Sequence, residues 1–303
     1  MKLGVDPEFF ILDRHNKPIN AFSVCKGTKY EPYKSNDIEI FYDNVLLEFN
    51  TLPASNLNEF LDTISTAIFE TVKVVDGNSI SLLASIDFDE SELNSVNAKE
   101  FGCVPDFDAY TLTQNDTAET LLKTSTFRTA GGHIHIGGHN TDIVCHPLMK
   151  PMFVFMLDLF VGIPSVLIDH GTDSYKRRKY FGRAGSHRDK PYGLEYRVLS
   201  PFWLRNKSTT QLIYKLVEFV FDNMNDSIYK KFFNFNVDKL KSDNPETAYD
   251  CFGYDLNAVA TTINECNFDK AKNFWMFASN FMPNHLIQQV EYEMNQPKVL
   301  TLV

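Results

Sequence analysis

Four short segments of the chain carry carboxylates or imidazoles at the spacing of a β-strand. In the first, Gly4-Val5-Asp6-Pro7-Glu8, the acids are two residues apart, so on a strand Asp6 and Glu8 point to the same face. Neighbouring carboxylates repel each other unless a cation lies between them. The pair therefore indicates a cation site, with a solvated strand end as the alternative. Because Pro7 cannot donate to a central ladder, we expect this strand to begin or to edge its sheet.

The second segment places one acid inside an apolar strand. Glu48 interrupts the run Val45-Leu46-Leu47-Glu48-Phe49, where an unpaired carboxylate would be costly if it were buried. Glu48 must therefore face water or meet a cation. Asp43 has the opposite parity, so it reaches the same face only if the chain turns or bulges between the two residues.

The third segment, Ala130–Gly138, holds two histidines between pairs of glycines. Alternation places His133 and His135 on one face of a strand and the intervening isoleucines on the other. The flanking glycines allow close approach of the backbone, which indicates a site rather than an isolated structural histidine. These glycines form neither of the glycine-rich phosphate-binding patterns, so a Rossmann or P-loop cradle is not supported.

The fourth segment, Gly193–Leu199, places Glu195 and Arg197 on one face. A simple salt bridge between them is the alternative to a functional role. Upstream lies a basic island in an otherwise acidic protein: residues 176–179, Arg183 and Arg188. Arginine binds phosphate oxygens in a bidentate manner, so this island indicates a phosphate clamp, with a solvated loop as the alternative.

Together the segments supply an oxygen-rich set of ligands with a little imidazole. Its members are Asp6, Glu8, Glu48, Glu195 and one or both of His133 and His135. Such a set suits Mg²⁺ or Mn²⁺ better than zinc, which prefers more nitrogen and sulfur ligands. Carboxylate-bound divalent metals beside several arginines are typical of phosphoryl transfer from a nucleotide.

The composition narrows the class of protein that positions these groups. Of 303 residues, 44% are hydrophobic and 22% charged, which is typical of a globular chain and excludes a disordered or fibrous one. The net charge of −10 argues against a nucleic-acid partner. The five cysteines form no CxxC pair, so neither a disulfide framework nor a thiolate zinc site is expected.

The N-terminus and the most apolar stretch of the chain indicate where in the cell the protein is located. Acids by position 6 exclude a signal peptide at the N-terminus. The most apolar stretch, residues 152–168, is broken by Asp158, Gly162 and Pro164 and falls short of the ~20 apolar residues that a membrane span needs. We therefore expect a cytoplasmic protein with no membrane partner.

The periodicity of apolar residues predicts an α+β protein without internal repeats. Strands are expected at 9–12, 45–49, 79–86, 133–137 and 194–199, and helices at 56–75, 147–168 and 208–224. Residues 87–127 are predicted to form loops, and the last eighty residues to be mostly helical. Nothing in the sequence splits the chain, so we expect a single domain over residues 1–303.

The four segments, in this order, resemble the phage-type carboxylate–amine ligase family (type 2), within the glutamine synthetase and glutamate–cysteine ligase superfamily. The matching motifs are Gly4-Val5-Asp6-Pro7-Glu8-Phe9, the acidic strand at 45–50, Gly131–Gly137 and Gly193-Leu194-Glu195-Tyr196-Arg197. They cover roughly the first 205 residues. Glutamine synthetases have Glu-x-Glu in the first motif, so Asp6 is one methylene shorter than its counterpart.

The resemblance implies a glutamine synthetase-like fold, in which a curved antiparallel sheet forms a trough for ATP and substrates. It implies a metal site at Asp6, Glu8, Glu48, His133 and Glu195. Nucleotide phosphates would meet His135, Arg183, Arg188 and Arg197, with Arg183, Arg197 and Glu195 catalytic. Two further residues, Arg128 and Lys29, are candidates for substrate contacts, although a solvated strand end and a loop lysine are the alternatives.

The implied activity is an ATP-dependent ligase that forms an amide or isopeptide bond through an acyl phosphate, with Mg²⁺ or Mn²⁺ as cofactor and a carboxylate and an amine as substrates. Segments 87–127 and 171–192 are candidate lids that exclude water. Two other functions remain open: a metal-dependent amide hydrolase or phosphotransferase on the same site, and an inactive binding or assembly protein that keeps the fold. The identity of the substrates and the oligomeric state are open as well.

Overall fold

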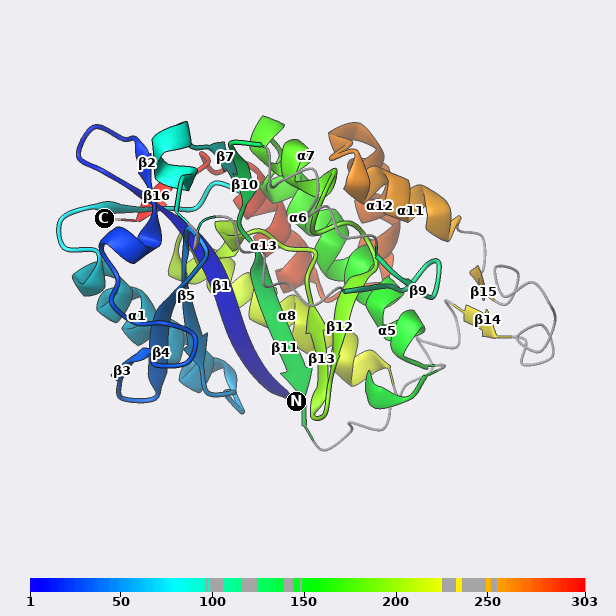
Figure 1. The fold of residues 1–303 in the computed structure, drawn as a ribbon. Helices are drawn as coiled ribbons and strands as arrows, with labels where there is room; N and C mark the ends of the chain where they lie inside the picture. The colour runs from blue at the N-terminus through cyan, green and yellow to red at the C-terminus, as the bar shows by residue number, and fades with distance from the viewer. Residues whose placement is uncertain are drawn as a thin grey trace.

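The computed structural model describes residues 1–95, 98, 106–115, 125–138, 144–147, 149–224, 233–235, 249–251 and 255–302. Twelve strands form one sheet: β1 (Lys2–Leu12), β2 (Pro18–Ile19), β3 (Tyr33–Ser35), β4 (Ile38–Asp43), β5 (Leu46–Thr51), β6 (Ser79–Ser81), β8 (Phe107–Asp108), β9 (Thr113–Gln114), β11 (Gly132–Gly137), β12 (Ser186–Lys190), β13 (Gly193–Tyr196) and β16 (Thr301–Leu302). The order along its main path is β3-β4-β5-β1-β11-β13-β12-β8-β9, and every ladder in it is antiparallel (Figure 1).

Two smaller ladders join β7 (Ser85–Asp87) to β10 (Phe127–Thr129) and β14 (Phe233–Phe235) to β15 (Tyr249–Cys251). The described helices are α1 (Leu57–Val74), α5 (Met149–Leu157), α6 (Ile163–Ile168), α7 (Thr172–Arg178), α8 (Lys207–Asn223), α11 (Leu256–Asn264), α12 (Phe268–Ala278) and α13 (Asn284–Met294). Short helical turns are η1 (Ala21–Ser23), η2 (Glu90–Leu93), η3 (Asp158–Gly162), η4 (Pro201–Leu204) and η6 (Ser279–Phe281). The predicted α+β class is confirmed.

The helices α1 and α8 begin where the sequence predicts, because asparagine caps fix their first turns. The side chains of Asn56 and Asn206 accept hydrogen bonds from the backbone N–H of Glu59 and Thr209, respectively. The predicted strand at 79–86 is instead two short strands, β6 and β7. They belong to different sheets, since β6 pairs with β1 and β7 with β10.

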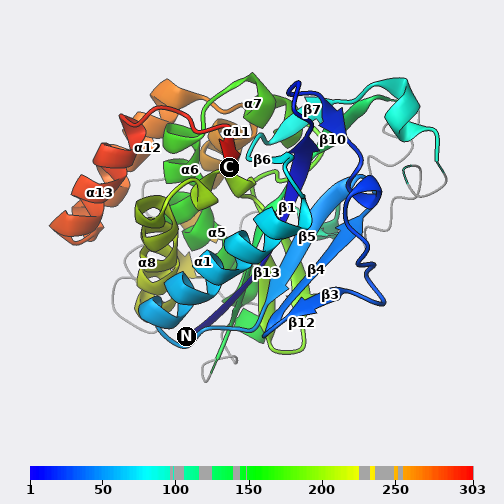
Figure 2. The same ribbon diagram turned by 90° about the vertical axis from the view of Figure 1, so that its left-hand side faces the viewer.

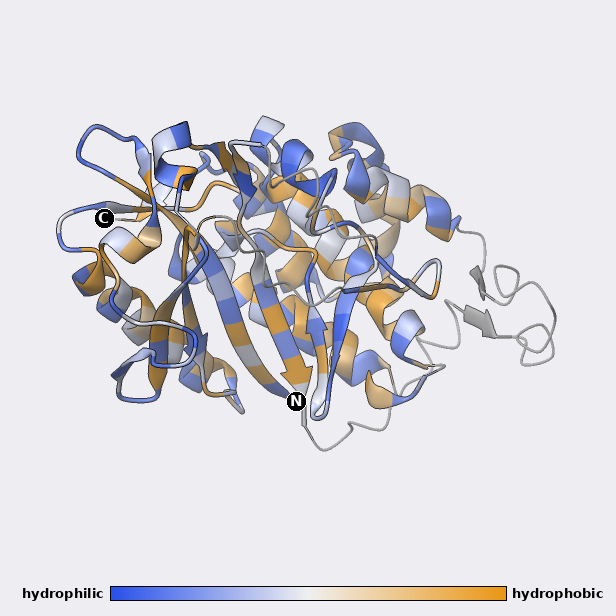
Figure 3. Cartoon of the chain, viewed as in Figure 1, coloured by the Kyte–Doolittle hydropathy of each residue, from blue (hydrophilic) through white to orange (hydrophobic). Residues whose placement is uncertain are grey.

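Alternation along the strands separates a core face from a polar face. Leu3, Val5 and Phe9 of β1 are almost fully buried, as are Ile134 and Ile136 of β11. They join the same hydrophobic cluster as the inner faces of α1, α5, α6 and α8, which lie together on one side of the sheet (Figure 2). Hydrophilic and hydrophobic residues alternate visibly along the central strands in Figure 3. The even-numbered residues of β1, including Asp6 and Glu8, therefore face away from the helices.

The first strand is central, which corrects the expectation that Pro7 would place it at an edge. β1 lies between β5 and β11. Its ladder with β5 is confined to Glu8 and Phe9, so Pro7 lies just outside that ladder. A proline is tolerated in the middle of the strand because the ladder with β5 requires no N–H donor at this position.

The apolar stretch that was expected to be broken is one helical segment. Residues Met149–Ile168 run through α5, the π-helical turn η3 and α6 without interruption, with a mean hydropathy of 2.1 over the most apolar window. Pro164 directly follows the π-helical turn η3, where the regular hydrogen-bond ladder of the α-helix is already interrupted, so the missing N–H is accommodated. By length and composition this segment could cross a membrane, but that window is completely buried inside the protein.

The basic segment 171–192, expected to be a loop, is mostly a helix and a strand. Arg177 and Arg178 belong to α7 and are 2% and 3% exposed rather than solvated. Arg178 donates to the carbonyl of Ile263 and to the hydroxyl of Ser165, so it joins α7 to the helical layer. In the other candidate lid, 87–127, which was predicted to form loops, the structure describes the short elements η2, β8 and β9, while 96–97, 99–105 and 116–124 lie outside the described residues.

A buried carboxylate connects the helical layer to the back of the sheet. Asp158 of η3 accepts hydrogen bonds from the hydroxyl of Tyr196 on β13 at 2.7 Å, from that of Tyr110 at 3.0 Å and from the backbone N–H of Gly185 at 2.7 Å. Burial raises the pKa of this carboxyl from 3.8 to about 7, although all three donors oppose the shift.

This shift predicts a pH-dependent stability. Because the pKa of Asp158 is higher in the folded state, its contribution is complete below about pH 4 and is lost as the pH rises through about 7. The substitution Asp158→Asn should flatten that part of the curve, since an amide can keep the contacts without titrating. Urea unfolding of both proteins at several pH values measures the effect. Equal slopes for the two proteins would show that Asp158 does not titrate in this way.

Candidate functional site

Strand pairing brings the four acidic and imidazole segments together on the polar face of the sheet. The register sets Asp6 of β1 opposite His133 of β11, and Glu8 opposite Glu48 of β5. On the other side of β11, His135 lies opposite Glu195 of β13. The predicted cluster is therefore assembled from strands β5, β1, β11 and β13, which are adjacent in that order.

The centre of the cluster is Asp6 with the two histidines. Oδ1 of Asp6 is 2.9 Å from Nε2 of His135 and 3.6 Å from Nδ1 of His133. Burial opposes ionisation of Asp6, but the two imidazoles outweigh it and hold the pKa of the carboxyl well below its usual range. Asp6 is therefore a carboxylate in a largely buried position.

Three ligand atoms, one each from Asp6, His135 and Glu195, lie within 4.8 Å of one another. The carboxylate oxygen Oδ1 of Asp6 is buried, and Nε2 of His135 is the ring nitrogen nearest to it. Nδ1 of His133 lies next to the same acids, 3.6 Å from Oδ1 of Asp6 and 3.7 Å from Oε1 of Glu195. Two carboxylates and one imidazole form a donor set that fits a divalent cation of the Mg²⁺ or Mn²⁺ type.

Glu195 is completely buried and is surrounded by cations. It forms ion pairs with Arg197 of its own strand, with Lys190 at 2.8 Å and with Arg188 at 3.4 Å. Burial raises its pKa and Arg197 is the strongest opposing influence, so that the pKa falls to about 2. The predicted pairing of Glu195 with Arg197 exists, but within a buried network in which loss of one partner is costly.

The acids on the other side of β1 are crowded and only partly neutralised. Burial raises the pKa of Glu48 well above its usual range, and Asp6, Glu8 and Asp43 raise it further. Asp43 reaches this face because β4 and β5 form a hairpin through Asn44, which adopts a positive φ of 61°. Lys29, 3.8 Å from Asp43 and more than half exposed, is the cation nearest that carboxylate among the described ion pairs.

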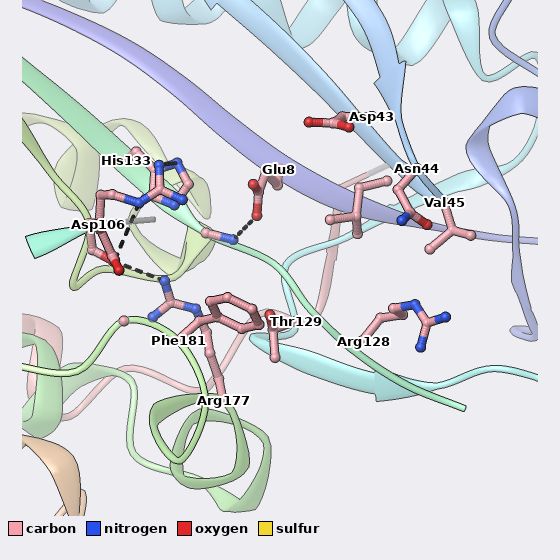
Figure 4. A pocket seen from close by; sticks show the side chains of 14 residues that line it. Glu8, Asp43, Asn44, Val45, Asp106, Arg128, Thr129, His133, Arg177 and Phe181 are labelled. Carbon is pink, nitrogen blue, oxygen red and sulfur yellow. Dashed lines mark hydrogen bonds and ion pairs between the residues drawn. The ribbon is translucent and has the colours of Figure 1, made fainter. Parts of the chain in front are cut away.

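The contacts of Gly131 with Glu8 and His133 account for a glycine at this position, just before the histidine strand. The backbone N–H of Gly131 donates to Oε2 of Glu8 at 2.6 Å, while Glu8 N–H donates back to the Gly131 carbonyl (Figure 4). A Cβ at Gly131 would lie 2.1 Å from Nε2 of His133. The imidazole thus packs directly on the glycine backbone, and a larger residue would displace it.

Two cavities flank the cluster. The smaller, about 70 Å³, is bordered by Glu8, His133 and Arg197, by Asp106, which sequence reasoning did not assign to the site, and by Arg177 of the predicted basic island. Figure 4 shows Arg128 at the opposite end of this cavity from His133 and Asp106. A volume of this size holds a few water molecules or a small substituent.

The larger cavity, about 690 Å³, lies over the other side of the cluster. Asp6, Glu48 and His135 contribute to its wall, together with four cationic residues: Lys2, Lys29, Arg188 and Lys190. Its volume is in the range of small-molecule binding sites. A cavity with carboxylates on one wall and cations on another can accept an anion together with a metal ion.

Two further residues that the sequence predicted for the site, Arg128 and Arg183, do not form part of the carboxylate cluster. Arg128 is buried rather than solvated, and its guanidinium donates to the carbonyls of Ser125 and Phe127. The Arg183 side chain lines neither cavity and makes no ion pair with the described residues. Arg177 borders the smaller cavity instead and donates to the carbonyls of Val198 and Arg197.

Two residues of the β12–β13 hairpin also escaped the sequence prediction. Lys190 lies two residues after Arg188 on β12, so the two side chains share a face of the strand. The alternation of the strand could therefore have predicted Lys190 as a site residue. Tyr192, in the turn, places its hydroxyl 2.5 Å from Nδ1 of His135. No local pattern marks such a turn residue, because its contact depends on the antiparallel return of the hairpin.

The acidic cluster predicts that Mg²⁺ or Mn²⁺ stabilises the protein. A cation that binds only the folded state adds about 2.7 kcal/mol to the free energy of unfolding at a hundredfold excess over its Kd. Thermal unfolding with and without each metal measures this, and Asp6→Asn should remove the increase. The exposed Asp62 on α1, replaced by Asn, is the control. An equal increase in the Asp6→Asn variant would place the metal elsewhere.

Comparison with known proteins gives a family match and distant matches among solved structures. No curated protein matches the chain. Among solved structures, a bifunctional glutathione synthetase from Pasteurella multocida matches with 10% identity and a TM-score of 0.37, over 97% of this chain and 51% of that one. The chain thus spans about half the length of that enzyme, and so low a score does not establish a shared fold.

The family match covers two of the four strands that form the site, β11 and β13, but not β1 and β5. Residues 122–241 match the model described as phage phiEco32-like COOH.NH2 ligase-type 2. This region contains β11 with both histidines and β13 with Glu195. The match confirms the resemblance of this chain to the phage-type carboxylate–amine ligases.

Proposed function

We propose that the protein is an ATP-dependent carboxylate–amine ligase. The observation that carries this proposal is the charge order across one face of the sheet. Acids lie on β4, β5 and β1, imidazoles on β11, and cations on β12 and directly after β13, where Arg188, Lys190 and Arg197 surround Glu195. A metal–nucleotide complex needs this order, with the metal toward the carboxylates and the phosphates toward the cations. The family match over β11 and β13 supports the same activity.

The larger cavity is the proposed site of the nucleotide. Lys2, Lys29, Arg188 and Lys190 provide positive charge around it, and its volume suits a nucleoside triphosphate. Asp6 and Glu195, with His133 or His135, would hold Mg²⁺ or Mn²⁺, and Glu8 and Glu48 extend the acidic side. The metal would neutralise charge on the triphosphate when bound.

The residues then act by orientation and charge stabilisation. An oxygen of the substrate carboxylate attacks the γ-phosphorus, the bond from that phosphorus to ADP breaks, and an acyl phosphate forms. Arg197 and Arg188, held against Glu195, stabilise the negative charge on the transferring group. An amine then forms a C–N bond, phosphate leaves and the ammonium proton passes to solvent.

We infer that this site belongs to one catalytic domain with the curved-sheet fold of the glutamine synthetase superfamily. The open antiparallel sheet, with its site on the polar face and helices against the core face, supports that fold. The smaller cavity, bordered by Arg177 and Arg197, is the proposed position of the substrate carboxylate next to the γ-phosphate. Arg183 then has no assigned role at the site, and Arg177 takes the place expected for it.

Nucleotide binding measured by calorimetry tests the proposal. We expect ATP and a non-hydrolysable analogue to bind only with Mg²⁺ or Mn²⁺, and Glu8→Gln and His133→Ala to weaken binding by at least tenfold. The matched controls are Glu291→Gln and His285→Ala, both exposed on α13. Absence of binding with either metal would refute an ATP-dependent ligase.

Product formation separates the ligase from other enzymes on the same site. A ligase forms ADP only when both a carboxylate and an amine are present. A phosphotransferase would need one acceptor only, and an amide hydrolase would need no ATP.

A further inference from the structure

The turn of the β12–β13 hairpin is held tightly against the end of β11. A Cβ at Gly193, where φ is 153°, would lie 1.9 Å from the carbonyl oxygen of Ile136. A Cβ at Gly137 would lie 2.5 Å from the carbonyl oxygen of Tyr192. The two glycines therefore allow the turn to lie directly on β11, and this contact fixes the backbone of Tyr192 relative to the histidine strand.

Tyr192 uses this position to contact His135. Its hydroxyl is 2.5 Å from Nδ1, and the two ring centroids are 6.0 Å apart. The other ring nitrogen, Nε2, faces Oδ1 of Asp6 at 2.9 Å. Both ring nitrogens of His135 therefore have a contact, Nδ1 with the Tyr192 hydroxyl in the turn and Nε2 with the Asp6 carboxylate of the acidic cluster. Tyr192 is half-exposed and borders the larger cavity together with His135.

We propose that Tyr192 is a positioning residue, whose hydroxyl on Nδ1 orients the His135 imidazole so that Nε2 is presented to Asp6 and the larger cavity. The inference rests on the proposed function only for the identity of the ligand, since the contact itself exists without one.

A hydroxyl is suited to this role because it can donate or accept. With the proton of His135 on Nε2, facing the Asp6 carboxylate, the Tyr192 hydroxyl donates to Nδ1. If Nε2 instead binds a cation, it must be unprotonated, so the ring proton is on Nδ1. Nδ1–H then donates a hydrogen bond to the tyrosine oxygen. Burial, Glu195 and Asp6 raise the pKa of Tyr192 to about 12, so the hydroxyl keeps its proton. The same ring orientation is thus maintained with or without a ligand.

The test replaces Tyr192 by Phe, which removes the hydroxyl and keeps the ring. Histidine labelled with ¹⁵N reports the tautomer of each imidazole, and His135→Gln assigns the signal of His135. At one fixed pH above the ordinary titration range of histidine, wild-type protein should show His135 in a single tautomer, with Nδ1 unprotonated. In Tyr192→Phe we expect shifts averaged between tautomers. Tyr30→Phe, at a residue that is 94% exposed, should leave the signal unchanged.

Binding of Mn²⁺ provides the second measurement. Loss of a residue that orients a metal ligand typically weakens metal binding 10- to 100-fold, so we expect about a tenfold rise in Kd for Tyr192→Phe and none for Tyr30→Phe. Equal unfolding temperatures would show that folding is intact. Unchanged His135 signals in Tyr192→Phe would overturn the proposal. Failure of the wild-type protein to bind metal would count against the proposed function instead, while the tautomer result would still decide the role of Tyr192.

Discussion

The arrangement of the site depends on the need to neutralise carboxylates that the sheet removes from water. Glu195 has no exposed surface and Glu48 very little, and an isolated charge in such a position is costly. Arg197, Arg188 and Lys190 neutralise Glu195, whereas the acids around Glu48 mainly repel one another. Charge on the polar face is therefore balanced near β12, whereas acidic groups are in excess near β5. This excess favours binding of a cation between the two regions.

Strand order makes this asymmetry possible. β1 is the strand on which two ladders meet, so its even-numbered acids lie next to Glu48 on one side and the histidines on the other. The odd-numbered residues of the same strand enter the hydrophobic core, and their packing against the helices keeps the register in place. A shift by one residue would turn Asp6 and Glu8 toward the helices. Core packing and site geometry are thus two consequences of one pairing.

Contacts behind the sheet keep its basic side in place. Asp158 is hydrogen-bonded to Tyr196, the last residue of β13, whose neighbours along the chain are Glu195 and Arg197. The buried Arg177 side chain of α7 donates to the carbonyls of Arg197 and Val198, so α7 also contacts the backbone just after this strand. The position of Arg197 therefore depends on groups on both faces of the sheet. Tyr192 adds a contact from the hairpin turn, which makes the second histidine part of the same connected structure.

The sequence by itself determined which residues share a face, because the period of a strand is two and the caps of α1 and α8 are local. It identified Asp6, Glu8, Glu48, both histidines and Glu195, and the structure brings all of them together. It could not determine which strands are neighbours, so Pro7 was wrongly placed at an edge and the basic run at 176–179 was taken as a possible solvated loop. Lys190, Asp106 and Tyr192 joined the site only through tertiary structure, and Arg177, one of the predicted basic island, borders the smaller cavity because of the packing of α7. Their positions depend on strand order, on the packing of α7 and on a hairpin return, which are long-range contacts that no local pattern encodes.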